Sequence, residues 1–235
     1  MIEKLKTLLH IRKPKTIEKS IDERISDLYE SLQVDVLAVA FGDDILPFAQ
    51  NIVNGIGKLR IKLKDQSGFI IPPIRVINDK GLQENEIQIL VRGHVVYSDF
   101  AIPTKEYVLK YVMSNLSKLA TKNVSEIFSN EITEKYIDLV QKNNSWLIWN
   151  VLRLVPVTGI KVILVDILKA GKSIKDIVFV FEKICEYASE NKDFTISKDP
   201  YRIAECVKRD LVWYIFSILH LKMVLLRLSA EKYHL

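Results

Sequence analysis

The sequence contains few cysteines and few histidines. Its 235 residues include two cysteines, Cys185 and Cys206, and four histidines. Two cysteines cannot form the disulfide framework of a small secreted protein, so we expect a reducing compartment, the cytoplasm. The cysteines and histidines are dispersed and show neither H-x-x-x-H nor C-x-x-C spacing. The sequence therefore predicts no metal site and no cofactor.

Long apolar runs are absent as well. The longest stretch without Asp, Glu, Lys or Arg covers thirteen residues, 45–57, and it contains Pro47 and two asparagines, whereas a membrane-spanning helix needs about 20 apolar residues. Residues 211–226 are apolar but include His220 and Lys222, which favours a buried helix. The charged N-terminus also lacks the apolar core of a secretory signal. We expect neither a membrane-spanning helix nor export.

Glycine and proline are scarce, with 8 and 7 residues, and 49% of the residues are hydrophobic. This composition excludes fibrous repeats and intrinsic disorder as the main state of the chain. The length is sufficient for one large domain or two small ones with a hydrophobic core.

Signatures of catalysis are missing too. The sequence Gly171-Lys172-Ser173 matches the end of a phosphate-binding loop motif. Asp166, however, occupies the position of the motif's first glycine, where a carboxylate would repel phosphate. No G-x-S-x-G motif occurs. The pair Asp43 and Asp44 has no carboxylate partner that the sequence identifies. The sequence predicts no catalytic residues and no enzyme.

The sequence changes character near residue 103. Short β-branched runs come before this point and helical patterns after it. We expect strands at 34–41, 74–77, 87–91 and 94–100, a helix at 48–65, and helices at 105–120, 131–141, 145–154, 158–169, 174–189 and 200–228. The predicted fold is α+β, a small β-α-β-β-β subdomain followed by an all-helical subdomain. The predicted parts are a basic arm with a linker helix (1–31), the α+β subdomain (32–103) and the helical subdomain (104–235).

Local signals refine this prediction. The last two strands are expected to form a hairpin that turns at Arg92-Gly93. The segment from Ser173 to Asp176 is typical of a capping box, so a helix is expected to start there. Trp146 and Trp149, three residues apart, are expected to pack in the core.

The net charge of +5 is concentrated at the N-terminus. Residues 1–20 hold six cations against Glu3 and Glu18, which gives +4. Apolar residues in this arm share one helical face, so the arm is suited to docking on an anionic surface. Without a partner, we expect a frayed and solvated terminus. The predicted contacts with an anionic surface are Lys4, Lys6, Arg12, Lys13, Lys15 and Lys19.

Three segments show a more specific pattern. They are VDVLAVAFGDDILPF at 34–48, GFIIPPIRVIND at 68–79 with Leu59-Arg60 before it, and VDILKAGKSIKDIVFVFEKICEYA at 165–188. Their order resembles the cytosolic part of the FHIPEP family, the export-gate proteins of flagellar and virulence type III secretion. The resemblance spans about residues 34–188. The matching motif positions are Gly42, Pro47, Arg60, Gly68, Pro72, Pro73, Arg75, Asp79, Gly93, Ser173, Lys175, Asp176 and Glu182.

The resemblance implies a cytosolic protein without enzymatic activity that docks export components, chaperones or further copies of itself. The family's insertion between the last strand and the first long helix is reduced here to Ala101-Ile102-Pro103. We also expect the chain to lack the family's membrane half and its final C-terminal subdomain. The chain would then be either a separate protein or an excised piece of a longer one.

We therefore expect a non-enzymatic protein-interaction module, able to form homo-oligomers, in the cytoplasm or at the inner face of the membrane. The alternative is a module that binds an anionic membrane surface or nucleic acid through its basic arm. Of these two ligands the membrane surface is favoured, because the arm occupies the place where the family's membrane half would join.

Overall fold

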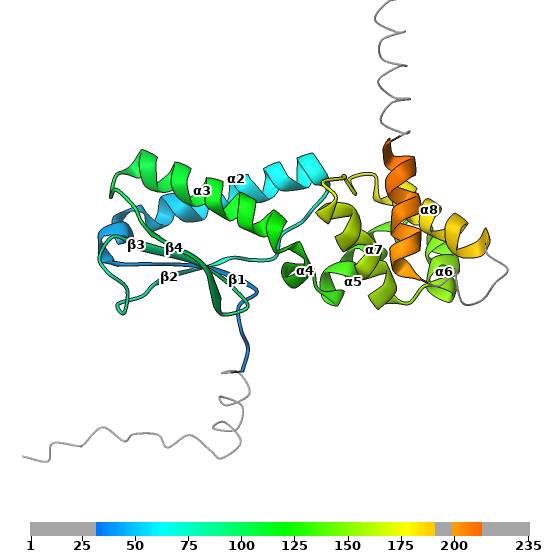
Figure 1. The fold of residues 1–235 in the computed structure, drawn as a ribbon, viewed down its shortest axis with the longest axis horizontal. Coiled ribbons are helices and arrows are strands. Elements are labelled where there is room, and N and C mark those ends of the chain that lie inside the picture. The colour runs from blue at the N-terminus through cyan, green and yellow to red at the C-terminus, as the bar shows by residue number, and fades with distance from the viewer. Residues whose placement is uncertain (1–31, 191–198, 213–235) are drawn as a thin grey trace, which may run out of the picture. The chain divides into compact units, whose positions relative to one another are not determined.

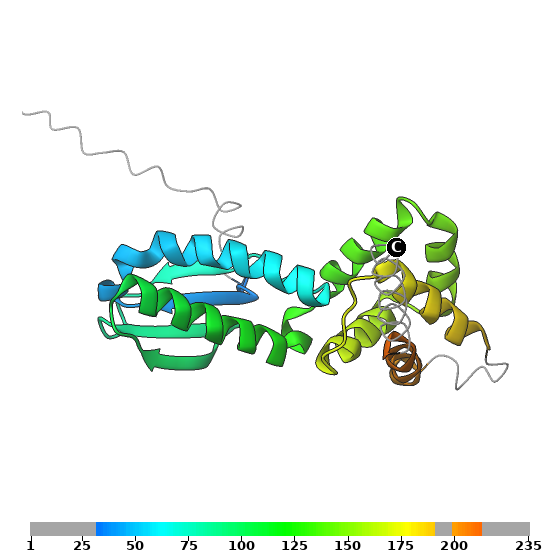
Figure 2. The ribbon, with the colours of Figure 1, turned by 90° about the horizontal axis from the view of Figure 1, so that it is seen from above.

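The computed structural model describes residues 32–190 and 199–212 (Figure 1, Figure 2). The chain divides into two units, Met1–Val34 and Asp35–Leu235, and the elements below belong to the second unit. None of the helices described here is long and apolar enough to cross a membrane.

A four-stranded mixed sheet begins this unit. Its strands are β1 (Leu37–Phe41), β2 (Arg75–Asn78), β3 (Glu86–Val91) and β4 (His94–Phe100), in the order β2-β1-β3-β4. β1 pairs parallel with β2 and antiparallel with β3, and β3 pairs antiparallel with β4. All five residues of β1 are buried, as expected for an apolar strand between two neighbours.

The β3–β4 hairpin turns at Arg92 and Gly93, as predicted. Both residues have positive φ angles, 49° and 76°, and the flanking Val91 and His94 are paired. Two consecutive positive φ angles are typical of the type I′ turn, whose twist matches that of the strands.

Two long helices lie side by side on one face of the sheet (Figure 1, Figure 2). They are α2 (Ala49–Ser67), which follows the short 3₁₀ helix η2 (Asp43–Phe48), and α3 (Lys105–Lys122). One stripe of α3 is buried, formed by Val108, Val112, Leu116 and Ala120. The spacing of these residues is that of an amphipathic helix packed on a sheet.

Helices follow to the end of the described chain. They are α4 (Val124–Ile127), α5 (Asn130–Gln141), α6 (Ser145–Leu154), α7 (Val157–Lys169) and α8 (Ile177–Glu190), and residues 200–212 are helical. The predicted α+β class, with a β-α-β-β-β subdomain before a helical one, is confirmed. The subdomain boundaries at residues 31 and 103 stay predictions.

The predicted start of the last complete helix is wrong. α8 begins at Ile177, not at residue 174, and its cap is Asp176, whose carboxylate accepts a hydrogen bond from the Phe179 N–H at 3.1 Å. The hydroxyl of Ser173 instead accepts from the Lys175 N–H at 3.1 Å, within a local turn. Ile174 is fully buried, and its burial holds residues 173–176 outside the helix. Asp199 caps the helical residues 200–212, because its carboxylate accepts a hydrogen bond from the Tyr201 N–H at 3.0 Å.

Candidate docking site

The end of α2 meets the segment that precedes α8. Gly68 ends α2 with a φ of 75°, and its N–H donates to Lys64 O at 2.9 Å. A Cβ at Gly68 would lie 2.6 Å from the backbone nitrogen of Lys175. The Ile174 N–H donates to Ser67 O at 2.8 Å, which fixes the two segments together. Only glycine satisfies both the left-handed backbone and this close approach.

Tyr136 on α5 also stabilises this end of α2, through hydrogen bonds to the backbone of Gly68 and Ile70. Its buried hydroxyl donates to Gly68 O at 2.6 Å and accepts from the Ile70 N–H at 3.0 Å. Its ring stacks on Phe128, which stacks in turn on Phe69, with centroids 5.7 and 6.0 Å apart. Burial raises the pKa of Tyr136 to about 12, so its hydroxyl stays protonated at neutral pH. Nothing in the sequence pattern singled this residue out.

A cavity of about 440 Å³ opens beside this junction, between residues 70–73 and α5. Its apolar wall is formed by Val36, Ile70, Ile71, Pro72, Pro73, Ile132 and Leu139. Its polar rim includes Arg60, whose Nε donates to Ile71 O at 3.1 Å, and the ion pair of Lys135 with Glu131 at 2.6 Å. A concave apolar surface with a few polar groups at its edge is suited to binding side chains of a partner.

The structure brings six of the predicted motif positions to this region. Arg60, Pro72 and Pro73 line the cavity, and Gly68 contacts Lys175 behind it, next to Ser173. The sequence identified these residues as a pattern and gave no sign that they meet.

Other motif positions lie at the ends of the sheet and shape the backbone there. A Cβ at Gly42 would lie 1.9 Å from Gln83 O, so glycine is required at the end of β1. The Asp79 carboxylate accepts from the Gly81 N–H at 2.8 Å, which forms the turn after β2. Arg75 pairs with Asp35 at 3.1 Å on the surface.

The remaining predicted positions have separate places. Pro47 lies within η2, Gly93 forms the hairpin turn and Glu182 is exposed on α8. The six basic residues predicted to contact an anionic surface lie outside the described residues.

The predicted burial of the two tryptophans of α6 is wrong. Trp146 is 75% exposed and Trp149 is 62% exposed, and the Arg153 guanidinium lies 5.2 Å from the Trp149 ring centroid. The sequence of α6 is apolar around most of the helix circumference. Its buried face is formed by Leu147, Ile148, Asn150 and Val151. The tryptophans therefore lie on the opposite face, where they form an exposed aromatic surface, here called the α6 face.

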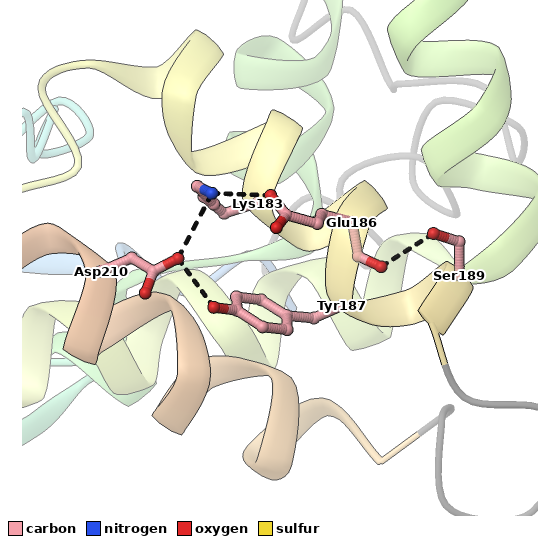
Figure 3. A network of polar contacts seen from close by, with 5 residues as sticks. All are labelled: Lys183, Glu186, Tyr187, Ser189 and Asp210. Carbon is pink, nitrogen blue, oxygen red and sulfur yellow. Dashed lines mark hydrogen bonds and ion pairs between the residues drawn. The ribbon is translucent and has the colours of Figure 1, made fainter.

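Figure 3 shows a polar network that joins α8 to the helical residues 200–212. Lys183 pairs with Glu186 at 2.6 Å and with Asp210 at 3.4 Å, and the Tyr187 hydroxyl donates to Asp210 at 2.8 Å. The hydrogen bond from Lys183 to Glu186 raises the pKa of Lys183, so the amine stays charged at neutral pH. The charged and polar groups of this network pair with one another, which indicates that they have a structural role.

No three His, Cys, Asp or Glu side chains within residues 32–190 and 199–212 are placed to hold a metal ion. Burial raises the pKa of the Cys185 thiol, which lowers its fraction of nucleophilic thiolate at neutral pH.

Comparison with known proteins gives a consistent result. The sequence model of the FHIPEP family matches residues 104–232. The flagellar biosynthesis protein FlhA of Borreliella burgdorferi is 21% identical over an alignment 251 positions long, which takes in 82% of this chain. That alignment takes in 36% of the relative, so the chain spans about a third of its length.

Two solved structures share the fold. The structure of the Chlamydia pneumoniae CdsV and CdsO protein complex matches with a TM-score of 0.65 at 16% identity, covering 74% of this chain and 69% of the other. The nonameric EscV cytosolic domain from the type III secretion system matches with a TM-score of 0.61 at 18% identity, covering 79% of this chain and 67% of the other.

Proposed function

The chain belongs to the FHIPEP family, whose sequence model matches more than half of its length, and from this we propose that it is a non-enzymatic protein-interaction module of a protein-export gate. It docks export components, chaperones or further copies of itself in the cytoplasm. The match of the family to residues 104–232 is the observation that carries this proposal, and the resemblance to export-gate cytosolic domains supports it.

Self-association is the first part of this function. One similar structure is a nonamer. The exposed tryptophans of the α6 face offer this chain a suitable contact, because large exposed aromatic side chains are enriched at protein interfaces. We assign the α6 face to contact with a second copy.

Partner docking is the second part. One similar structure is a complex of CdsV with the CdsO protein. The 440 Å³ cavity beside α5 has an apolar wall and a charged rim, and motif positions of the family gather there. We assign this cavity to apolar side chains of an export component or chaperone.

The test of self-association is the mass of the protein in solution, measured by light scattering over a range of concentrations. The proposal predicts species heavier than the 27.1 kDa monomer, and their loss in the Trp146→Ser/Trp149→Ser variant. Tyr201→Ser is the matched control, because Tyr201 is 62% exposed but lies outside the α6 face. Oligomers that persist in the tryptophan variant would exclude the α6 face as the contact.

A further inference from the structure

The two helices that cover the sheet carry a large positive charge. α2 and α3 contain eight Lys and Arg residues against Asp65 and Glu106, which gives +6. The other charged residues of 32–103 are three cations and seven anions, which gives −4. The basicity of the chain therefore has a second centre besides the N-terminal arm, on the two helices that cover the sheet.

A groove runs between these helices, here called the α2/α3 groove. It contains a hollow of about 470 Å³ with an apolar floor of Leu59, Leu109 and Met113, and Gly55 also lines it. A Cβ at Gly55 would lie 2.6 Å from Leu109 Cδ1 and 3.0 Å from Met113 Sδ. Glycine at this position thus lets the side chains of α3 come close to α2.

Lysines line the rim of the α2/α3 groove on both sides. Lys58 and Lys62 come from α2 and Lys118 from α3. A second hollow of about 370 Å³, lined by α3 and by Tyr97 of β4, shares Lys118 with the first and contains Lys110. The α2/α3 groove itself therefore combines lysines from both helices with an apolar floor.

These lysines have no acidic partner within the described chain. No ion pair joins Lys58, Lys62, Lys110 or Lys118 to a carboxylate in residues 32–190 and 199–212, whereas Lys64 nearby pairs with Asp65 at 3.0 Å. Like charges along one groove repel each other. A ligand that brings carboxylates would relieve this repulsion.

The chemistry of the rim and floor distinguishes between anionic ligands. The cations on this rim are lysines, whose compact ammonium groups pair with carboxylates and with phosphates alike, so the rim sets the sign of the ligand and the apolar floor sets its second requirement. The one arginine of α2, Arg60, donates to Ile71 O and lines the cavity beside α5 instead. Met113 offers a polarizable floor that adapts to apolar side chains of different shapes. This combination fits a protein segment that carries both carboxylates and apolar side chains.

We infer that the α2/α3 groove docks an acidic amphipathic segment of a partner protein. The inference rests on the proposed function as a protein-interaction module, and it adds a surface and the chemistry of its partner. The apolar face of the segment lies on Leu109 and Met113, and its carboxylates face Lys58, Lys62 and Lys118.

The probe for this site is a fluorescent synthetic peptide in which leucines recur at helical spacing between glutamates. Its fluorescence anisotropy is measured against the full chain. Matched probes have the same composition in scrambled order, or glutamine in place of glutamate. The expected result is preferential binding of the amphipathic acidic probe, with an affinity that falls as salt is added.

The test variant is Lys58→Glu/Lys62→Glu/Lys118→Glu. The control variant is Lys80→Glu/Lys142→Glu/Lys169→Glu, which changes the net charge equally at exposed lysines outside the α2/α3 groove. Each exposed ion pair contributes weakly, so the loss of three pairs is expected to lower affinity about tenfold or more in the test variant alone. Circular dichroism confirms that both variants are folded.

Several outcomes would overturn the inference. They are equal binding of the scrambled probe, equal loss in the two variants, or no binding by the wild-type chain. Vesicles containing phosphatidylglycerol and a double-stranded oligonucleotide are tested with the same variants. Binding of either one that depends on Lys58, Lys62 and Lys118, without binding of the peptide, would assign the groove to that ligand instead. Failure of the peptide in a chain that still forms oligomers would refute the α2/α3 groove site and leave the proposed function standing.

Discussion

Substitution of Gly68 by alanine tests the junction on which the cavity depends. Two effects act at this position. The first is backbone strain, because the φ of 75° lies in the left-handed region, where an L-residue with a Cβ costs about 1–2 kcal/mol. The second is steric, because the new Cβ would lie 2.6 Å from the Lys175 nitrogen and would displace residues 174 and 175.

The displacement has its own cost. It breaks the hydrogen bond from the Ile174 N–H to Ser67 O, worth about 1 kcal/mol, and it disturbs the burial of Ile174, which adds about 1–2 kcal/mol. Gly68→Ala is therefore expected to lower the free energy of unfolding by about 3–5 kcal/mol.

Gly171 provides the matched control. Its φ is 68°, close to that of Gly68, but no atom lies within 4 Å of a Cβ built there. Gly171→Ala is therefore expected to lower the free energy of unfolding by the backbone strain alone, about 1–2 kcal/mol. Urea unfolding followed by circular dichroism measures both variants. An equal loss of stability in the two would refute the close approach of residues 174 and 175 to the end of α2.

Further predictions concern other parts of the molecule. Tyr136→Phe removes the hydroxyl that bridges Gly68 and Ile70, and urea unfolding should show a loss of about 1–3 kcal/mol, mainly from unpaired backbone groups. The fold raises the pKa of Tyr136 from 10 to about 12, so it stabilises the protonated form; this stability is present below pH 10 and is lost as the pH rises towards 12. Alkaline unfolding should show a smaller loss over this range in Tyr136→Phe, and an equal loss in both proteins would refute the assignment. Asp166→Asn should destabilise by about 1 kcal/mol in urea, because the half-buried Lys208 loses one of its two carboxylate partners, Asp166 at 2.7 Å, and keeps Glu205 at 2.6 Å; no change would refute a stabilising pair. Deletion of residues 1–20 should abolish pelleting with vesicles that contain phosphatidylglycerol, and unchanged pelleting would refute the proposed role of the basic arm.

Much of the fold could be predicted because the local signals agree with it. The apolar run at 34–41 predicted the central strand, and Arg92-Gly93 predicted the hairpin turn that the structure contains. These features depend on residues close in sequence, where backbone preference and hydrophobic period act directly.

The features that could not be predicted depend on contacts between distant segments. Asp176 and not Ser173 caps α8, because the burial of Ile174 and its bond to Ser67 hold the preceding residues outside the helix. The exposure of Trp146 and Trp149 was missed because an apolar helix has no unique buried face until its neighbours are known.

The candidate site shows the same limit. The sequence pattern identified Arg60, Gly68 and Pro72 as members of a family motif. Their meeting with α5 through Tyr136 depends on tertiary packing. The α2/α3 groove was missed for a similar reason, since charges spaced along two helices become one surface only when the helices lie side by side.

We propose that this chain is a protein-interaction module that associates with itself through the α6 face. Sedimentation velocity gives the mass distribution of the full chain, with and without Trp146→Ser/Trp149→Ser. We expect oligomers that grow with concentration in the wild-type chain and are absent in the tryptophan variant. A single 27.1 kDa species at every concentration of the wild-type chain would contradict this proposal.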